Sequence, residues 1–233
     1  YGLSESGTEQ STLFVMDVAT HELLPERIPD TRGAGVAWLP DASGFYYVRD
    51  PHPGEFPEEE RFYHRRIFFH RLGTDPDDDP LVYEHENMYA WPAAQVSTDG
   101  RYLLISVYLG AGRNDLYVRD LEGDGELRTI AEGLPSIFFG GAIGSDFYMM
   151  TRYEAPNGRI MKVDLERPGR EHWVELVPET EDVLTSFLSI EGRLVLSYMR
   201  NALSALEVYT TDGESLGELP LPPLGGKSVN PAL

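Results

Sequence analysis

One arrangement of apolar and polar residues recurs along the chain. A short apolar strand leads into a turn that contains Gly, and a second strand rich in aromatic and aliphatic residues follows. The recurrences are residues 35–44 with 45–49, residues 94–100 with 101–107, residues 141–145 with 146–151, and residues 186–192 with 193–198. None of these runs has the 3.6-residue period of an amphipathic helix. The pattern therefore predicts repeated β-hairpins and no helix.

Two further β-rich runs follow each hairpin. The third strands are expected at 67–71, 116–120, 160–164 and 206–210, and shorter fourth strands at 81–84, 127–130, 173–177 and 216–219. The turn glycines Gly44, Gly100, Gly144 and Gly192 repeat every 44 to 56 residues. Four strands per repeat at this period are typical of propeller blades, which stack face to face because each sheet has two apolar faces.

The sequence thus predicts an all-β fold, a β-propeller of four-stranded antiparallel blades with about four complete blades and two partial ones. We expect a single domain over 1–233, divided into a partial blade at 1–33, blades at 34–86, 87–132, 133–180 and 181–223, and the start of a further blade at 224–233. Residues 1–33 lack the innermost strand of their blade, and residues 219–223 read as an interblade connection. We interpret the chain as a fragment that forms an open arc rather than a closed ring.

The clearest single hairpin runs from Arg65 to His85 through the acidic turn at 75–79. Carboxylates at Asp75, Asp77, Asp79 and Glu86 have the spacing of a calcium loop, although Pro80 stands where such a loop needs Gly. The alternative to a calcium site is a solvated acidic turn, because Asp and Pro are common turn residues. We favour the solvated turn.

Histidines at 64, 70 and 85 surround this hairpin. A strand would hold the first two about 20 Å apart on one face, too far for one zinc ion. We therefore expect strand-surface or blade-packing histidines and no metal site. Residues 50–61 form a Pro- and Glu-rich insertion between two strands, which we expect to be solvated and free to move.

Composition excludes several classes of function. The 233 residues carry a formal net charge of −20 and only two Lys among their 19 basic residues, which argues against binding to nucleic-acid phosphates. There is no Cys, so disulfides, thiolate metal sites and a cysteine nucleophile are excluded. No apolar run is long enough to span a membrane, and no secretory signal opens the chain. We expect no cofactor and a cytoplasmic location, with the periplasm as the alternative.

The opening Tyr-Gly-Leu-Ser-Glu-Ser-Gly at 1–7 and the run Arg-Arg-Ile-Phe-Phe-His-Arg-Leu-Gly-Thr at 65–74 resemble the seven-bladed propeller of the prolyl oligopeptidases. These are serine peptidases that cut short proline-containing peptides. The resemblance extends over the whole chain. It implies a propeller placed over an α/β-hydrolase domain, whose Ser, His and Asp carry out the acyl transfer.

Catalysis by these 233 residues alone is not expected. The G-x-S-x-G pentad at 213–217 falls between the strands expected at 206–210 and 216–219, whereas a serine-nucleophile elbow needs a strand-to-helix turn. The paired glycines at 140–141 and 225–226 are better interpreted as turn or interblade glycines. The resemblance places apolar rim positions of the substrate pocket at Gly33, Trp91 and Ala111. The family often has larger side chains at the first and last of these. The alternative for the Trp is packing between blades.

We therefore interpret the chain as the substrate-gating propeller of a prolyl-oligopeptidase-like serine endopeptidase, with the hydrolase domain and short peptides as its partners. Neither a nucleic acid nor a membrane is expected as a partner. One alternative is a stand-alone propeller that binds peptides or proteins without enzymatic activity. Another is a propeller enzyme with a calcium ion in its channel.

Overall fold

Strands dominate the computed structural model, which describes residues 1–5, 7, 9–32, 35–110 and 112–221. Within these ranges there are nineteen strands and three single-turn 3-10 helices, η1 (Glu58–Glu60), η2 (Pro76–Asp78) and η3 (Arg170–His172). The prediction of an all-β chain is confirmed. The chain forms two compact units, residues 1–129 and the residues from Ile130 onward, and each is described by itself.

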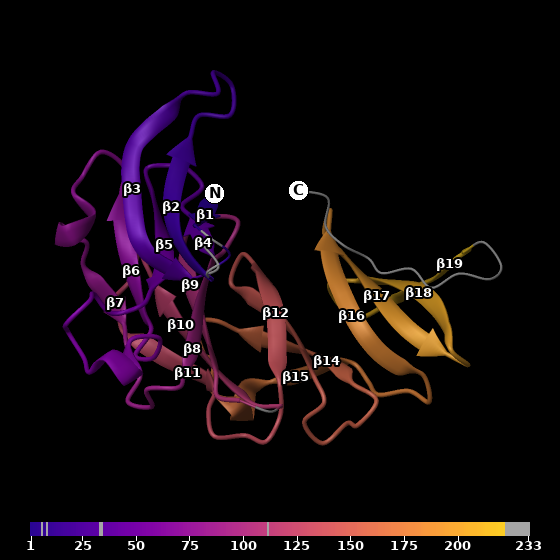
Figure 1. Ribbon diagram of the computed structural model, residues 1–233. Coiled ribbons are helices and arrows are strands. Elements are labelled where there is room, and N and C mark those ends of the chain that lie inside the picture. Colours follow the sequence, from indigo (N-terminus) through magenta and orange to yellow (C-terminus); the bar gives the residue numbers. More distant parts are fainter. Residues whose placement is uncertain (6, 8, 33–34, 111, 222–233) are drawn as a thin grey trace. The chain divides into compact units, whose positions relative to one another are not determined.

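The first unit contains three antiparallel sheets (Figure 1). The first sheet has three strands in the order β1 (Gly2–Ser4), β2 (Gln10–Met16) and β3 (Leu23–Arg32). The second has the order β4 (Val36–Trp38), β5 (Gly44–Arg49), β6 (Arg66–Arg71) and β7 (Leu81–Tyr83). The third consists of β8 (Trp91–Val96), β9 (Tyr102–Tyr108), β10 (Asn114–Asp120) and β11 (Leu127–Ala131), whose last two residues are assigned to the second unit.

The second unit contains two four-stranded antiparallel sheets. One is β12 (Phe138–Ile143), β13 (Asp146–Thr151), β14 (Arg159–Asp164) and β15 (Val174–Val177). The other is β16 (Val183–Ile190), β17 (Arg193–Arg200), β18 (Leu203–Thr210) and β19 (Ser215–Leu219). Four complete blades and a three-stranded partial one are therefore present. The further blade expected at 224–233 lies outside the described residues, and the single domain with its predicted boundaries stays a prediction.

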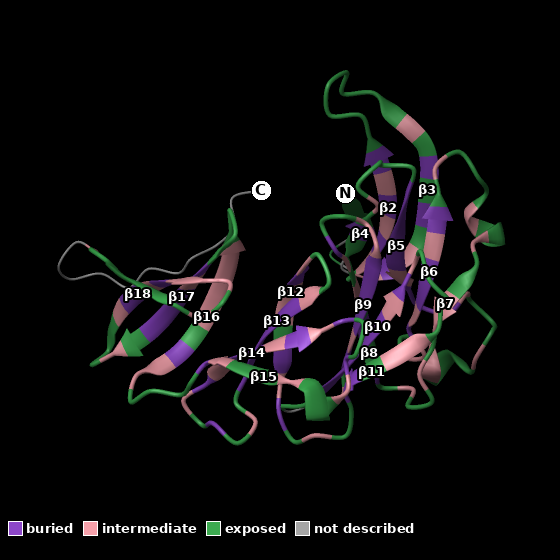
Figure 2. Cartoon of the chain, turned by 180° about the vertical axis from the view of Figure 1, so that it is seen from behind, coloured by how far each residue is buried: buried purple, intermediate pink, exposed green. Residues whose placement is uncertain are grey.

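In three of the four complete blades, the second strand is buried on both faces over most of its length. Every residue of β13 except the half-buried Asp146 is buried, and four consecutive residues are buried at the start of both β5 and β9. The outer strand β19, in contrast, is exposed at all five positions. Figure 2 shows this gradient, with buried positions concentrated on the middle strands. Burial on both faces explains why these second strands lack the alternation of a half-buried strand.

Apolar clusters fill the spaces between neighbouring sheets of each unit. In the first unit, Phe45 and Tyr47 of β5 pack with Ile28 of β3. The opposite face of the same strand presents Tyr46 to a cluster that includes Ile105 of β9. In the second unit, one cluster joins β13 and β14 to β17. β5 thus contributes alternate side chains to two cores, which is the packing expected of stacked blades.

The turn glycines differ in what they require of the backbone. Gly100, Gly144 and Gly192 have φ of 80°, 57° and 71°, in the left-handed region that favours glycine. Gly44 is different, because the positive φ of its turn belongs to Ala42 (55°). A Cβ on Gly44 would collide with the backbone carbonyl of His70 on the paired strand. Gly44 therefore does not supply the positive φ of its turn; it permits close approach of two strands.

Gly140 and Gly141 also serve a strand rather than a turn. Both lie within β12 and pair with Met149 and Tyr148 of β13. A Cβ on Gly140 would overlap the backbone carbonyl of Tyr148. The interpretation of this pair as turn or interblade glycines is therefore wrong, because absence of a side chain lets the two strands approach.

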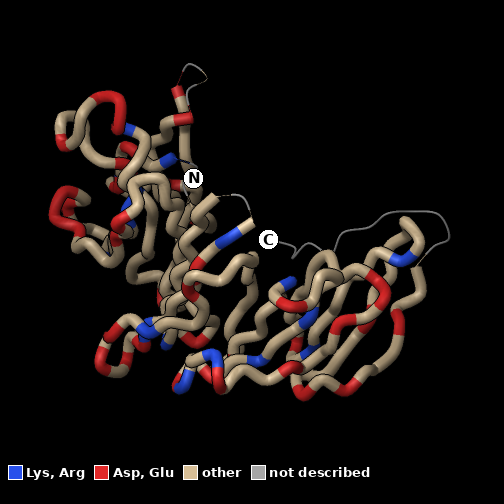
Figure 3. The backbone as a smooth tube through the Cα atoms, turned by 90° about the horizontal axis from the view of Figure 1, so that it is seen from below, with Lys and Arg blue, Asp and Glu red and all other residues tan. Residues whose placement is uncertain are grey.

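Acidic residues are spread over the turns and loops of both units, with fewer Lys and Arg among them (Figure 3). This distribution accords with the formal net charge of −20. Within the described residues, no helix is long and apolar enough to cross a membrane.

Candidate functional site

Trp91, the rim residue suggested by the resemblance, begins β8 and pairs with Tyr108 of β9. Its side chain is not packed between blades, because 52% of the residue's surface is exposed. The alternative expectation of burial between sheets is therefore wrong. The guanidinium carbon of Arg65 lies 4.2 Å from the centroid of the indole ring, a cation–π contact. Trp91 is thus exposed and held beside a cation.

Arg65 immediately precedes β6 and forms an ion pair with Asp50, which immediately follows β5. The Arg65 Nε lies 2.9 Å from the Asp50 Oδ1, and the two side chains are only 5% and 2% exposed. Burial raises the pKa of the Asp50 carboxyl and lowers the pKa of the Arg65 guanidinium, while their mutual attraction opposes both shifts. A buried ion pair of this kind fixes the guanidinium under the indole.

A hollow of about 220 Å³ opens beside this pair, and we call it the Arg65–Trp91 hollow. Its lining consists of Arg32, Gly35, Val48, Arg65, Trp91, Pro92 and Ala93. The guanidinium carbon of Arg32, at the end of β3, is 5.9 Å from the centroid of the Trp91 indole. Nη2 of Arg32 forms an ion pair with the carboxylate of Glu9. Two guanidinium groups and an exposed indole therefore meet on otherwise apolar walls, an arrangement suited to binding a small polar group on an apolar stem.

The other two predicted rim residues, Gly33 and Ala111, lie outside the described residues. Gly33 follows Arg32 in the sequence, and Ala111 follows Gly110. Their role in a substrate pocket stays a prediction, as does that of Trp91. Sequence reasoning missed the two arginines. The available signal was a pair of basic residues, Arg65 and Arg66, at the entry to an otherwise apolar strand.

The acidic turn at 75–79 is not solvated throughout. The Asp79 carboxylate is 2% exposed, and it accepts a hydrogen bond from the Tyr47 hydroxyl at 2.9 Å. Nδ1 of His70 lies 3.0 Å from both carboxylate oxygens, and the ring itself is fully buried. Burial raises the pKa of Asp79 despite these partners. The solvated interpretation is wrong for Asp79, although Asp77 remains 79% exposed.

The histidines are dispersed into separate environments. His64 precedes β6 rather than lying within a strand; its ring stacks on Phe56 at 3.9 Å, and Nε2 is 2.8 Å from Glu60 Oε2. His85 Nδ1 accepts a hydrogen bond from the Asn87 amide. Among the described residues, no group of three or more His, Cys, Asp or Glu side chains is arranged to hold a metal ion.

The insertion at 50–61 is mostly exposed, yet several contacts hold it. The stack of Phe56 on His64 is reinforced by an ion pair between Glu55 and Arg66, with 2.6 Å between Oε1 and Nη2. Arg61 donates a hydrogen bond to Gln10 of β2 at 2.9 Å. The insertion is therefore fastened to the strands on either side of it.

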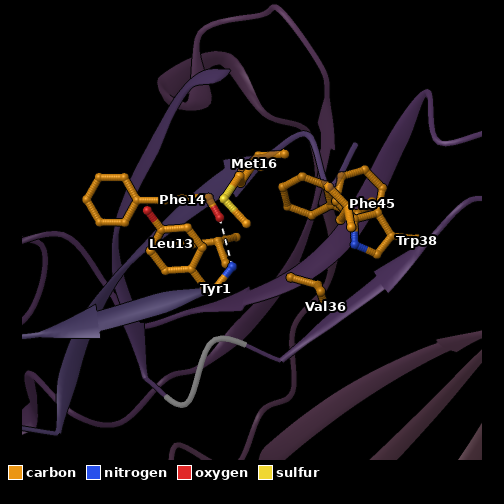
Figure 4. A pocket seen from close by; sticks show the side chains of 9 residues that line it. Tyr1, Leu13, Phe14, Met16, Val36, Trp38 and Phe45 are labelled. Atoms are coloured by element: carbon orange, nitrogen blue, oxygen red, sulfur yellow. Dashed lines mark hydrogen bonds between the residues drawn. The ribbon is translucent and has the colours of Figure 1, made fainter. Parts of the chain in front are cut away.

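A second hollow, of about 350 Å³, lies beside the three-stranded sheet (Figure 4). In Figure 4 the rings of Tyr1 and Phe14 stand on one side and those of Trp38 and Phe45 on the other, with Met16 between them. The Tyr1 ammonium donates to the Phe14 carbonyl at 2.9 Å. The lining has no charged side chain, so this hollow offers apolar packing and no acid–base chemistry.

The His70–Asp79 pair has the chemistry of a general base oriented by a carboxylate. Its ring is completely buried, however, and Nε2 has no hydrogen-bond partner among the described residues. Neither His70 nor Asp79 lines either of the two hollows, so we interpret the pair as part of the core. The Arg65–Trp91 hollow is the better candidate, and it has the chemistry of a binding site rather than of a catalytic one.

Comparison with known proteins gives a consistent result. The family model described as the prolyl oligopeptidase N-terminal beta-propeller domain matches residues 1–229. The chain is 28% identical to the prolyl endopeptidase of Elizabethkingia meningoseptica over 231 residues, 98% of this chain and 32% of that protein. It is also 28% identical to the prolyl oligopeptidase A of Galerina marginata, over 94% of this chain and 33% of that protein.

A solved structure from a study of two prolyl endopeptidases, including their inter-domain dynamics, is also similar. It superimposes with a TM-score of 0.88 at 30% identity, over 94% of this chain and 33% of the other. Prolyl oligopeptidase B from Galerina marginata shares the fold, with a TM-score of 0.82 at 23% identity. The chain spans about a third of the length of these relatives. It belongs to the family of prolyl oligopeptidase N-terminal β-propeller domains.

Proposed function

We propose that this chain is the substrate-gating propeller portion of a prolyl-oligopeptidase-like serine endopeptidase that cleaves short, proline-containing peptides. The observation that carries the proposal is the family match over residues 1–229. The nucleophile would lie in an α/β-hydrolase domain outside residues 1–233. The G-x-S-x-G pentad at 213–217 lies in the hairpin between β18 and β19, not at the strand-to-helix turn that a nucleophile elbow needs.

In this proposal the propeller acts by exclusion. Sheets that pack through shared apolar cores within each unit would keep folded proteins and bulk water away from a catalytic serine. Acyl transfer through Ser, His and Asp would take place in the hydrolase domain. The propeller would contribute side chains to the substrate-facing surface, with Trp91 as the described candidate. The proposal includes a cytoplasmic location, with the periplasm as alternative, to be tested by cell fractionation.

The test compares residues 1–233 alone with the product of the complete reading frame that encodes them. Residues 1–233 should not hydrolyse a chromogenic peptide that ends in proline. The complete product should hydrolyse it, should lose the activity to a serine-directed covalent inhibitor, and should leave a folded protein of similar proline content intact. Inhibitor-sensitive hydrolysis by residues 1–233 alone would contradict the proposal. An inactive complete product would favour the stand-alone binding propeller instead.

A further inference from the structure

We propose that the Arg65–Trp91 hollow binds a carboxylate carried by a peptide, either an acidic side chain or a C-terminal carboxylate. The inference rests on the proposed function only in taking a peptide as the carrier. The carboxylate itself follows from the side chains that line the hollow.

The first observation is a buried hydrogen-bond donor without an acceptor. Arg65 uses Nε toward Asp50, and its side chain is 5% exposed. Its Nη1 atom is buried and has no hydrogen-bond partner among the described residues, as is also true of both carboxylate oxygens of Asp50, which does not line the hollow. A buried donor left unpaired is costly, and the cost is larger for a charged group. A ligand oxygen that reached this nitrogen would remove that cost.

The second observation is the geometry of the cation. Arg65 cannot turn away from the hollow, because the ion pair holds one edge of the guanidinium and the Trp91 ring lies against it at 4.2 Å. A planar, fixed guanidinium is suited to the two oxygens of a carboxylate. Arg32 adds a second cation on the same lining. This pre-organisation lowers the entropy that binding would cost.

The third observation concerns the carrier. Val48 and Pro92 complete walls that are mainly apolar, and Trp91 is 52% exposed as a residue. Such walls favour a carboxylate attached to carbon over a free inorganic anion, because the methylene groups or ring of a peptide residue would bury apolar surface there. A hollow of about 220 Å³ accommodates one amino-acid residue rather than a folded partner.

The probes are four blocked tripeptides and one small anion, titrated into residues 1–233. The reference peptide is acetyl-Gly-Glu-Pro-amide, and acetyl-Gly-Gln-Pro-amide is its neutral isostere. The third peptide, acetyl-Gly-Gly-Pro, has a free C-terminal carboxylate, and the fourth, acetyl-Gly-Gly-Pro-amide, is its neutral counterpart. Sodium acetate is the small anion. Calorimetry gives affinities, and the indole NMR signals of the three Trp residues show where binding occurs. Only the signal of Trp91, assigned from Trp91→Phe, should shift.

We expect the Glu peptide or the free-carboxylate peptide to bind about ten- to a hundredfold more tightly than its neutral counterpart, the effect of one charge-assisted hydrogen bond. Whichever of the two binds more tightly identifies the source of the carboxylate. If acetate bound as tightly as either peptide, the part of the inference that names a peptide as the carrier would be overturned. Equal affinity for charged and neutral peptides, or no binding, would overturn the inference as a whole.

Arg65→Lys keeps a positive charge near Asp50 but loses the planar fork, and should weaken binding at least tenfold. Asp50→Asn combined with Arg65→Gln removes both buried charges together, so the fold does not retain one unpaired charge, and should abolish the preference for the carboxylate. Circular dichroism and urea midpoints verify that each variant is folded. Full affinity in the folded double variant would overturn the inference.

Arg101→Lys is the matched control. Arg101 also pairs with an aspartate, at 2.9 Å from Asp120, and its guanidinium lies 4.9 Å from the centroid of Tyr102, but it does not line the hollow. The Arg101→Lys variant should bind the peptides with unchanged affinity. The two proposals fail separately: peptide hydrolysis by the complete product without carboxylate preference refutes only this inference. Carboxylate preference with an inactive complete product refutes only the proposed function.

Discussion

Two aspartates of one turn, Asp77 and Asp79, should differ sharply in what they contribute to stability. The Asp79 carboxylate is 2% exposed and is contacted by the hydroxyl of Tyr47 and by Nδ1 of His70. Asp77 is 79% exposed, and its Oδ1 lies 3.9 Å from His52 Nε2. We expect Asp79→Ala to destabilise the first unit strongly and Asp77→Ala to have almost no effect.

The magnitude follows from the groups left behind. Hydrogen bonds to a charged group contribute about 1.5 kcal/mol each at the low end, so two of them amount to about 3 kcal/mol. Burial of the carboxylate opposes this gain, as its raised pKa indicates. Substitution, however, leaves the hydroxyl of Tyr47 and the ring of His70 buried without Asp79. The free energy of unfolding should fall by about 2 to 3 kcal/mol for Asp79→Ala, and by no more than about 0.5 kcal/mol for Asp77→Ala.

Urea unfolding of the two variants measures the difference as a shift of midpoint at constant slope. Tyr47→Phe supplies the partner for a double-mutant cycle, in which coupling to Asp79→Ala should be about 1 kcal/mol. Equal losses for the two aspartates would refute the reasoning, because they would show that the buried cluster contributes nothing that an exposed turn carboxylate does not. Zero coupling would refute the role of the Tyr47 hydroxyl.

Three further predictions concern other parts of the molecule. Gly140→Ala should cost more than about 2 kcal/mol in the free energy of unfolding, because its Cβ would collide with the backbone of Tyr148; a urea midpoint within error of the parent would contradict this. In NMR titrations the Asp79 carboxyl, whose pKa is raised by burial, should titrate above 3.8, and Asp99, whose pKa is lowered by a hydrogen bond from Ser97, below it. By linkage, the pH-dependent part of the stability that Asp79 contributes is present below its unfolded-state pKa and is lost as pH rises through its folded pKa. The part that Asp99 contributes is lost as pH falls through its own folded pKa; the reverse order of titration is the contrary result. Saturating Ca²⁺ should leave the Tm unchanged, and a concentration-dependent rise would restore a calcium site in the acidic turn.

Much of the fold could be predicted because burial on both faces produces a recognisable sequence. A middle strand must be apolar at nearly every position, so segments such as β13 and β9 stand out in the sequence. The outer strand β3 was harder to predict. It contains Pro25 and Pro29, which often interrupt strands, and yet it continues to Arg32. Proline at an outer strand removes a donor that the sheet does not need there, so it did not end the strand.

The candidate site could be predicted only in part, because sequence places a residue on a strand but does not specify its neighbours in other strands. Trp91 could be proposed from the resemblance alone. That it faces Arg65, a residue 26 positions earlier, depends on how β6 and β8 pack together in the first unit. The same limit applies to Asp79, since its burial depends on Tyr47 and His70 rather than on its own turn.

Buried charge is the feature that most clearly separates the Arg65–Trp91 hollow from the apolar hollow of Figure 4. A wall needed only for packing is more easily built from apolar residues, since burying the Asp50–Arg65 pair costs desolvation that hydrophobic residues of similar size would avoid. Asp50 directly follows β5 and Arg65 directly precedes β6. The ion pair engages Nε of Arg65 and leaves Nη1 without a hydrogen-bond partner among the described residues. An ion pair that satisfied itself completely would explain stability alone. The unpaired nitrogen beside an exposed indole is better explained by a ligand that completes the hydrogen bonding.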